Sequence, residues 1–195
     1  MICAVVLAAG RSVRMGSQKL LLPLKGKPLI THIVDEVLHG PVQKMFVVVG
    51  RDREQIRDAL SERAASFVHN PEPDGDMLSS VRCGIRALPQ SCAAALIVLR
   101  DQPGITRELI SQLAEAHSQN PGGIIAPEFN GKRGHPLLVA SRFFNEILHE
   151  HDGVGLHDLL NSHPEAVHRI PVTTTGVLED MDTPEDYQRH LRRGL

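Results

Sequence analysis

The sequence has no tryptophan, one tyrosine and five phenylalanines, so that aromatic side chains make up 3% of its 195 residues. A β-sandwich built around an aromatic-rich core is therefore not indicated. Hydrophobic residues still make up 42% of the chain, which is long enough to bury a substantial core. We expect that core to consist of Leu, Val, Ile and Ala, as in layered α/β proteins.

Cysteine is also scarce. Cys3, Cys83 and Cys92 are odd in number, far apart in the sequence and outside any CxxC pattern. This arrangement argues against a disulfide framework and against a structural zinc site. It fits a protein of the reducing cytoplasm.

Neither sign of charge is in excess, since 21 Lys and Arg face 23 Asp and Glu for a net charge of −2. A nucleic-acid partner and an anionic membrane surface are thus not indicated. The apolar runs are too short to span a membrane, and no signal-peptide pattern opens the chain. We expect one soluble, cytoplasmic domain over residues 1–195.

Short apolar runs alternate with amphipathic segments along the chain, which predicts a doubly wound α/β fold. This is a Rossmann-like three-layer sandwich with a mostly parallel central sheet. Runs that are apolar at successive positions predict buried parallel strands; these are residues 3–9, 44–50, 93–100 and 122–129. Periodic segments predict helices at residues 28–40, 52–63, 77–87, 106–117, 141–150 and 183–193. In such sheets ligands bind beyond the carboxyl ends of the strands.

The connection after the first strand has an unusual composition, VVLAAGRSVRMGSQKLLLPLKGKPLI. Ala8, Ala9 and Gly10 leave the main chain open to close approach by a phosphate, and amides in such a turn can form an anion-binding concavity. Arg14 and Lys19 add cationic donors. A strand-to-helix loop with solvated charges is the alternative reading. As an exposed loop residue, Lys19 is expected to contribute little to stability.

Two common phosphate-binding motifs are absent from this connection. Gly10 and Gly16 are too far apart for a Walker A motif, and Ser17 stands where that motif needs lysine. GxGxxG is missing as well, which counts against a nicotinamide-dependent oxidoreductase of similar layout.

The connection instead resembles the signature of the nucleotidyltransferase superfamily, the MobA-like NTP transferases. Its Leu-Ala-Ala-Gly opening and the later RGHP segment are similar to the molybdenum cofactor cytidylyltransferase (MocA-like) branch. The resemblance extends from Ala4 to Tyr187. It implies a triphosphate bound by Leu7, Ala8, Ala9, Gly10, Arg14 and Lys19, with Arg14, Lys19 and Asp101 as catalytic residues.

The same resemblance implies a Mg²⁺ ion held by Asp101 and Asp182. A carboxylate after a buried strand suits this hard cation, although such an Asp can equally cap a helix. Asp180 is a second candidate. Arg100 departs from the pattern, which has glycine before the Asp, and it could screen Asp101, pair with it or contact a substrate phosphate.

Three further segments are assigned by resemblance. Ser79 and Ser80 fall in the nucleotide-recognition loop, although simple capping also explains serines at a helix start. Arg133 and His135 fall in the acceptor-binding loop, and a structural histidine is the alternative. His157 stands where relatives have arginine, which suggests a different or weaker acceptor contact. A metal cluster of His149, His151 and His157 is not favoured, because nothing fixes its geometry.

The resemblance implies transfer of a nucleoside monophosphate from a nucleoside triphosphate to a phosphorylated small-molecule acceptor, with release of pyrophosphate. CTP and molybdopterin are the preferred pair, and a molybdoenzyme could receive the product. GTP, a sugar-phosphate acceptor, or a non-catalytic accessory protein that binds nucleotide or cofactor are the alternatives. Arg100 is the feature that favours the accessory role.

Overall fold

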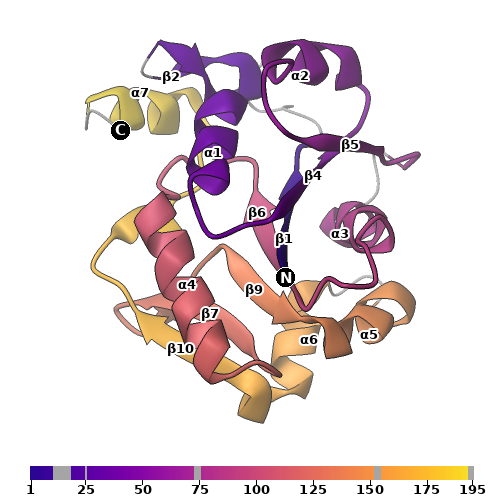
Figure 1. The fold of residues 1–195 in the computed structure, drawn as a ribbon. Helices are drawn as coiled ribbons and strands as arrows, with labels where there is room; N and C mark the ends of the chain where they lie inside the picture. Colours follow the sequence, from indigo (N-terminus) through magenta and orange to yellow (C-terminus); the bar gives the residue numbers. More distant parts are fainter. Residues whose placement is uncertain (11–18, 25, 73–75, 152–154, 193–195) are drawn as a thin grey trace.

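The computed structural model describes residues 1–10, 19–24, 26–72, 76–151 and 155–192, and it places a central sheet between two layers of helices (Figure 1). Within these ranges, no helix combines the length and the apolar character that crossing a membrane requires. The expected α/β fold with a mostly parallel sheet is confirmed.

The described strands of the sheet follow the spatial order β10-β7-β9-β6-β1-β4-β5, with β8 paired to β7. Neighbours are parallel except at β9, which runs antiparallel to both β6 and β7, and at β8, which is antiparallel to β7. A small separate hairpin joins β2 to β3. The bounds are β1 Ile2–Leu7, β2 Pro23–Leu24, β3 Lys27–Pro28, β4 Lys44–Val49, β5 Ser66–His69, β6 Ala94–Leu99, β7 Ile124–Phe129, β8 Lys132–Arg133, β9 Leu137–Ala140 and β10 Val167–Pro171.

Helices cover both faces of the sheet, which explains why its central strands are apolar at successive positions. Ala4 and Val6 of β1 face one core cluster, whereas Val5 and Leu7 face the other. Residues of α1, α2 and α4 fill the first cluster, and residues of α3, α5 and α6 fill the second. The bounds are α1 Leu29–Leu38, α2 Arg53–Ala59, α3 Met77–Arg86, α4 Arg107–Gln119, α5 Phe144–His149, α6 Leu156–Ser162 and α7 Pro184–Arg192.

Local sequence signals explain several helix ends. The Thr106 side chain caps α4 by accepting a hydrogen bond from the Leu109 amide, as its position before the helix suggests. Asp76 caps α3 in the same way through the Ser79 amide. Thr183 and Asp186 exchange hydrogen bonds at the start of α7. Tyr187, on α7, donates a hydrogen bond of 2.7 Å to the Pro23 carbonyl and so ties α7 to the β2–β3 hairpin.

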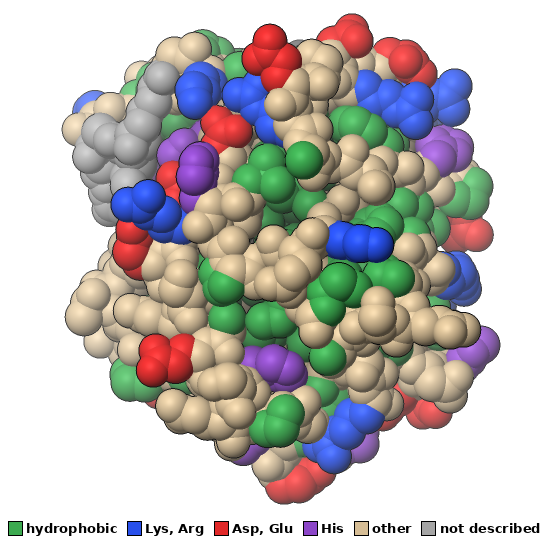
Figure 2. Space-filling model, viewed as in Figure 1, with side chains coloured by type: hydrophobic (Ala, Val, Ile, Leu, Met, Phe, Trp, Pro, Cys, Tyr) green, Lys and Arg blue, Asp and Glu red, His purple; other side chains and the backbone are tan. Residues whose placement is uncertain are grey.

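Charges on the surface are mixed. On the face that Figure 2 shows, acidic and basic side chains of the described residues are interspersed along the rim and do not gather by sign. This pattern agrees with the net charge of −2.

Candidate active site

The two segments that carry most of the predicted site leave neighbouring strands at the same edge of the sheet. Strand β1 pairs in parallel with β6, and Leu7 lies opposite Leu99 in that register. The loop that begins after β1 and the loop that begins after β6 therefore start side by side. This arrangement brings Gly10 and Asp101 to the carboxyl edge, where α/β proteins bind ligands.

Lys19 lies at the centre of this edge. Its Nζ atom is 2.9 Å from Oδ2 of Asp101, 2.8 Å from Oδ1 of Asp182 and 3.0 Å from the Met181 carbonyl oxygen. The side chain is 3% exposed. The expectation of an exposed loop lysine is therefore wrong, because two carboxylates and a carbonyl from distant segments bury and bind the ammonium group.

The loops that carry the two carboxylates are joined through their main chains. The Met181 amide donates a 2.7 Å hydrogen bond to the Asp101 carbonyl. Gly104 and Gly176 pack so closely that a Cβ on Gly104 would lie 2.5 Å from the Gly176 Cα. Glycine is needed at this contact, which lies between the segment that follows Asp101 and the segment that precedes Asp182.

Asp180 lies near these carboxylates but has a different partner. Its Oδ1 accepts a 2.9 Å hydrogen bond from Nε2 of Gln102. Burial raises the pKa of the Asp180 carboxyl; the Gln102 hydrogen bond opposes this, and the charges of Asp101 and Asp182 reinforce it. Gln102 was not among the predicted residues, although its place directly after Asp101 could have indicated it.

The predicted acceptor loop also reaches this edge. The His135 amide donates a 2.9 Å hydrogen bond to the Val177 carbonyl, which lies in the loop that leads to Asp182. Burial lowers the pKa of His135 to about 4, although the nearby charge of Asp101 opposes this effect. Its Nδ1 is buried without a hydrogen-bond partner among the described residues. Arg133, on β8, lies opposite Glu128 and is half-buried.

A third group lies where β5 ends and α3 begins. The Asn70 side chain is buried, and its Nδ2 donates to Oγ of Ser79 at 3.0 Å and to Oγ of Ser80 at 2.9 Å. Sequence reasoning missed Asn70, which is recognisable as an amide directly after a strand. Beside this group is a hollow of about 130 Å³, lined by Asn70, Pro71, Glu72, Ser79, Arg82, Cys83 and Arg86.

The phosphate-loop segment, which is the connection that follows β1, begins with small residues, and one of its first amides is hydrogen-bonded within the sheet. The Ala8 amide donates a 2.8 Å hydrogen bond to the Val48 carbonyl, so this N–H is not available to a ligand. Leu7 packs in the second core cluster, and Ala9 is half-buried beside it. Gly10 has a φ of +139°, a conformation that favours glycine. Arg14, predicted to bind the triphosphate, lies outside the described residues.

The structure does not bring His157 together with Lys19 and its partners. It lies exposed on α6, where its Nδ1 is 2.8 Å from Nδ2 of Asn161 on the same helix. In Figure 1, α6 lies at the opposite end of the molecule from α7, which follows Asp182 directly. The contact of His157 with the acceptor stays a prediction.

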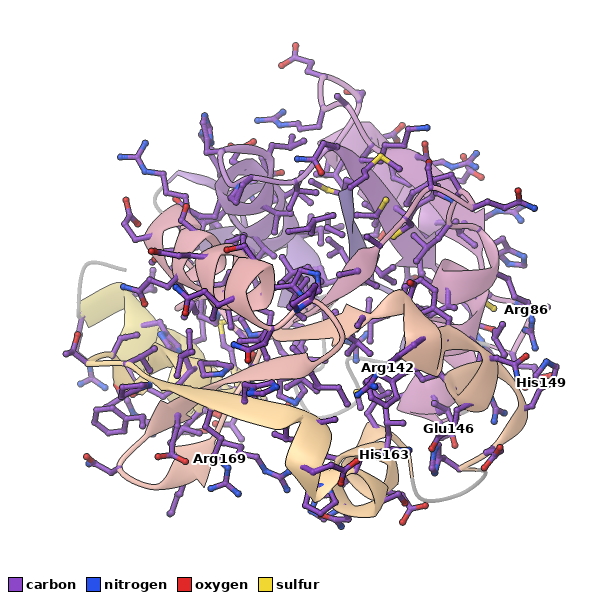
Figure 3. All side chains as sticks on the ribbon, turned by 60° about the horizontal axis from the view of Figure 1, so that its bottom comes forward. Arg86, Arg142, Glu146, His149, His163 and Arg169 are labelled. Carbon is purple, nitrogen blue, oxygen red and sulfur yellow. The ribbon has the colours of Figure 1, made fainter. Side chains whose placement is uncertain are left out.

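Two histidines near α5 and α6, His151 and His163, contact carboxylates. Nε2 of His151 lies 2.8 Å from Oε1 of Glu146, and its Nδ1 lies 2.7 Å from Oδ2 of Asp158. His163 contacts Oε2 of the same Glu146 at 2.9 Å, and Figure 3 shows these two side chains next to each other. Within the described residues, no three His, Cys, Asp or Glu side chains are grouped as metal ligands.

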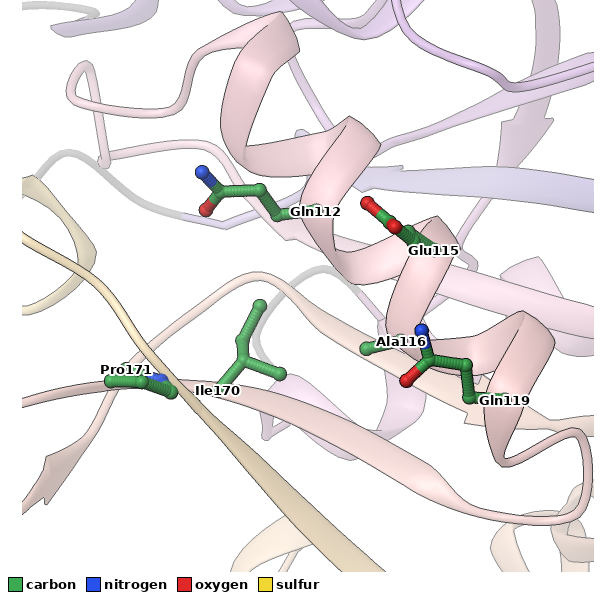
Figure 4. A pocket seen from close by; sticks show the side chains of 6 residues that line it. All are labelled: Gln112, Glu115, Ala116, Gln119, Ile170 and Pro171. Carbon is green, nitrogen blue, oxygen red and sulfur yellow. The ribbon is translucent and has the colours of Figure 1, made fainter.

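A second hollow, of about 240 Å³, lies between α4 and β10. Figure 4 shows Gln112, Glu115 and Gln119 on the helix and Ile170 and Pro171 on the strand. None of its lining residues is a predicted site residue.

The chain resembles known proteins in sequence over much of its length. Residues 4–167 match the MobA-like NTP transferase domain. The GlmU bifunctional protein of Shouchella clausii is 35% identical over 119 residues, which are 60% of this chain and 26% of that protein. The chain therefore corresponds to only part of that curated relative.

Solved structures resemble the chain over almost its whole length. A nucleotidyl transferase from Methanothermobacter thermautotrophicus has a TM-score of 0.86 at 26% identity, covering 100% of this chain and 97% of that one. The homologue of Mycobacterium tuberculosis Rv0371c from Mycobacterium sp. strain JC1 has a TM-score of 0.86 at 27% identity, covering 99% and 96%. Rv0371c itself, solved with manganese, shares the fold with a TM-score of 0.83 at 23% identity and 98% coverage of both chains.

Proposed function

Because the chain belongs to the MobA-like NTP transferase family, we propose that it transfers a nucleoside monophosphate from a nucleoside triphosphate to a phosphate acceptor, with release of pyrophosphate. CTP and molybdopterin are the preferred substrates, because the Leu-Ala-Ala-Gly opening and the RGHP segment resemble the cytidylyltransferase branch. GTP or a sugar-phosphate acceptor are the alternatives within the same reaction class.

The observation that carries this proposal is the convergence of Lys19, Asp101 and Asp182 at the carboxyl edge of the sheet, one loop away from Gly10. Attack of one phosphate on another brings anions together, so positioning and charge neutralisation supply most of the catalysis. A buried ammonium group next to a glycine turn meets that need. No covalent enzyme intermediate is required.

The oxygen atoms around Lys19 fit a divalent cation. Oδ2 of Asp101 and Oδ1 of Asp182 converge on the position of the Lys19 ammonium, and the Met181 carbonyl oxygen faces it as well. Hard cations such as Mg²⁺ bind one or two carboxylates together with phosphate oxygens. Asp101 and Asp182 would hold the ion, which when bound would neutralise charge on the triphosphate.

Each side chain of the site has a role in this reaction. An oxygen of the acceptor phosphate forms a bond to the α-phosphorus, and the bond from that phosphorus to the pyrophosphate oxygen breaks. Lys19 neutralises the reacting phosphoryl group, and Gly10 allows the triphosphate tail of the nucleotide to approach the main chain. The neutral His135 ring offers its Nδ1 to the acceptor, and Ser79 and Ser80, held by Asn70, contact the nucleotide.

Pyrophosphate release tests this function. The protein is incubated with Mg²⁺, molybdopterin or a sugar 1-phosphate, and each of CTP, GTP, ATP and UTP in turn. Release that requires both substrates supports the proposal, with CTP and molybdopterin expected to be the best pair. Binding of a triphosphate without turnover would instead support an accessory protein that carries nucleotide or cofactor.

A further inference from the structure

Arg100 contacts the first glycine of the phosphate-loop segment. It follows β6 directly and precedes Asp101, and its Nη1 donates a hydrogen bond to the Gly10 carbonyl. A Cβ placed on Gly10 would lie 2.7 Å from Nη1 and 2.9 Å from both Cζ and Nη2 of Arg100. The guanidinium group therefore packs closely against the Gly10 main chain and occupies the space of a side chain.

The Arg100 side chain reaches from the carboxyl end of β6 to that of the neighbouring strand β1. The carboxylates of Asp101, Asp182 and Asp52, the last of which follows β4, interact electrostatically with the guanidinium group. Burial lowers the pKa of the guanidinium and these three carboxylates oppose the effect, so that the group keeps its charge at neutral pH.

This geometry has a chemical consequence for an anionic ligand. The oxygen of a main-chain carbonyl carries partial negative charge, which disfavours a phosphate in its vicinity. Arg100 binds the Gly10 oxygen and adds a full positive charge beside it. The contact suits a polyphosphate passing the glycine turn, since the planar guanidinium keeps its positive charge while Nη1 is bound to the Gly10 oxygen.

We infer that Arg100 is a positioning residue for the triphosphate tail, fixing the Gly10 carbonyl and adding positive charge for the phosphates that Lys19 neutralises. This inference rests on the proposed function. It assigns to Arg100 a contribution to triphosphate binding.

The test compares wild type with Arg100→Met and Arg100→Lys. Isothermal titration with CTP and GTP, and with CMP and GMP, is carried out in Mg²⁺. Arg169→Met is the matched control, because Arg169 lies on the edge strand β10 paired with Glu128 and its loss changes the net charge equally. Thermal unfolding without nucleotide checks the fold, and Arg100→Gln replaces any variant that does not fold.

For Arg100→Met we expect the Kd of the tighter-binding triphosphate to rise about tenfold, with the monophosphate Kd changed less than about twofold. Arg100→Lys keeps the charge but not the planar fork, so its triphosphate Kd should lie between those of wild type and Arg100→Met. The kcat at saturating triphosphate should change little. Unchanged triphosphate affinity, or an equal loss for mono- and triphosphate, would overturn the inference alone. Wild-type protein that binds no triphosphate would overturn the proposed function as well.

Discussion

Lys19 donates a 2.9 Å hydrogen bond from Nζ to Oδ2 of Asp101, which lies 82 residues further along the chain. The same ammonium group binds Asp182, from a third segment of the chain. A lysine therefore bridges two carboxylates that would otherwise repel each other. A divalent ion bound by these carboxylates must compete with Lys19, which then becomes available to the phosphates.

Replacement of Lys19 by Met is expected to reduce turnover by orders of magnitude and also to destabilise the fold. Removal of the ammonium leaves Asp101 and Asp182 without their shared cation, at a cost of roughly 1–3 kcal/mol. Thermal unfolding should therefore shift down by roughly 3–10 °C. Millimolar Mg²⁺ should restore more stability to the variant than it adds to wild type; an equal effect on both would contradict competition between ion and lysine.

Asp101→Asn and Asp182→Asn are each expected to abolish the Mg²⁺ dependence of triphosphate binding, because each removes one of two converging carboxylates. Asp180→Asn is the comparison, since the Asp180 carboxylate is hydrogen-bonded by Gln102. In Asp180→Asn, the change in triphosphate affinity on addition of Mg²⁺ should stay within about threefold of the wild-type change. Triphosphate titrations with and without Mg²⁺ measure the effect, and an unchanged response in Asp101→Asn would remove this residue from the metal site.

Asn70→Ala should weaken nucleotide binding through Ser79 and Ser80. The buried Asn70 amide orients both hydroxyl groups, so its loss removes a donor from each and costs about 1–3 kcal/mol of stability, while Ser79 Oγ keeps its hydrogen bond to the Asp76 carbonyl. We expect KM for the triphosphate to rise with kcat largely retained. Asn161→Ala, on the exposed face of α6, serves as a control. A drop in kcat with KM unchanged would show that Asn70 serves chemistry and not binding.

The His151 contacts predict a pH-dependent stability. Burial alone would lower the pKa of His151, but hydrogen bonds with Asp158 and Glu146 outweigh it, so the pKa is raised. The charged histidine therefore stabilises the fold at pH values below its ordinary pKa of about 6.5. That contribution is lost as the pH rises through the folded pKa.

Thermal unfolding of wild type and His151→Gln at about pH 6 and pH 8.5 measures this contribution. The melting-temperature difference between the two proteins should be larger at the lower pH. His149→Gln, at the exposed end of α5, is the matched control and should show no such trend. A melting-temperature difference between wild type and His151→Gln that is the same at both pH values would contradict a stabilising role of the charged His151.

The central strands were predictable from the sequence because they are buried on both faces. β1, β4 and β6 all coincide with predicted apolar runs; their observed ends differ from the predicted ones by a residue or two, and β1 begins one residue earlier, at Ile2. Strand β10 was not predicted, since VHRIP mixes polar residues into an edge strand that is only half-covered. Strand β9 was also missed, because four apolar residues in LLVA do not reveal an antiparallel insertion.

The site was predictable in outline but not in its contacts. The glycine turn and Asp101 were recognised because each follows a buried strand. The burial of Lys19 could not be predicted, because its partners come from segments 82 and 163 residues away. Gln102 and Asn70 were also missed, although each stands directly after a predicted site residue or a strand; the sequence could not show which groups their amides contact.

A crystal structure with a non-hydrolysable CTP analogue and Mn²⁺ tests the central claim most directly, because anomalous scattering locates the ion. We predict a manganese peak in contact with both Asp101 and Asp182 and with phosphate oxygens, with Lys19 moved from the carboxylates onto the triphosphate tail. A nucleotide tail bound away from Gly10, or a Lys19 that still bridges the two carboxylates with the ion elsewhere, would contradict the account.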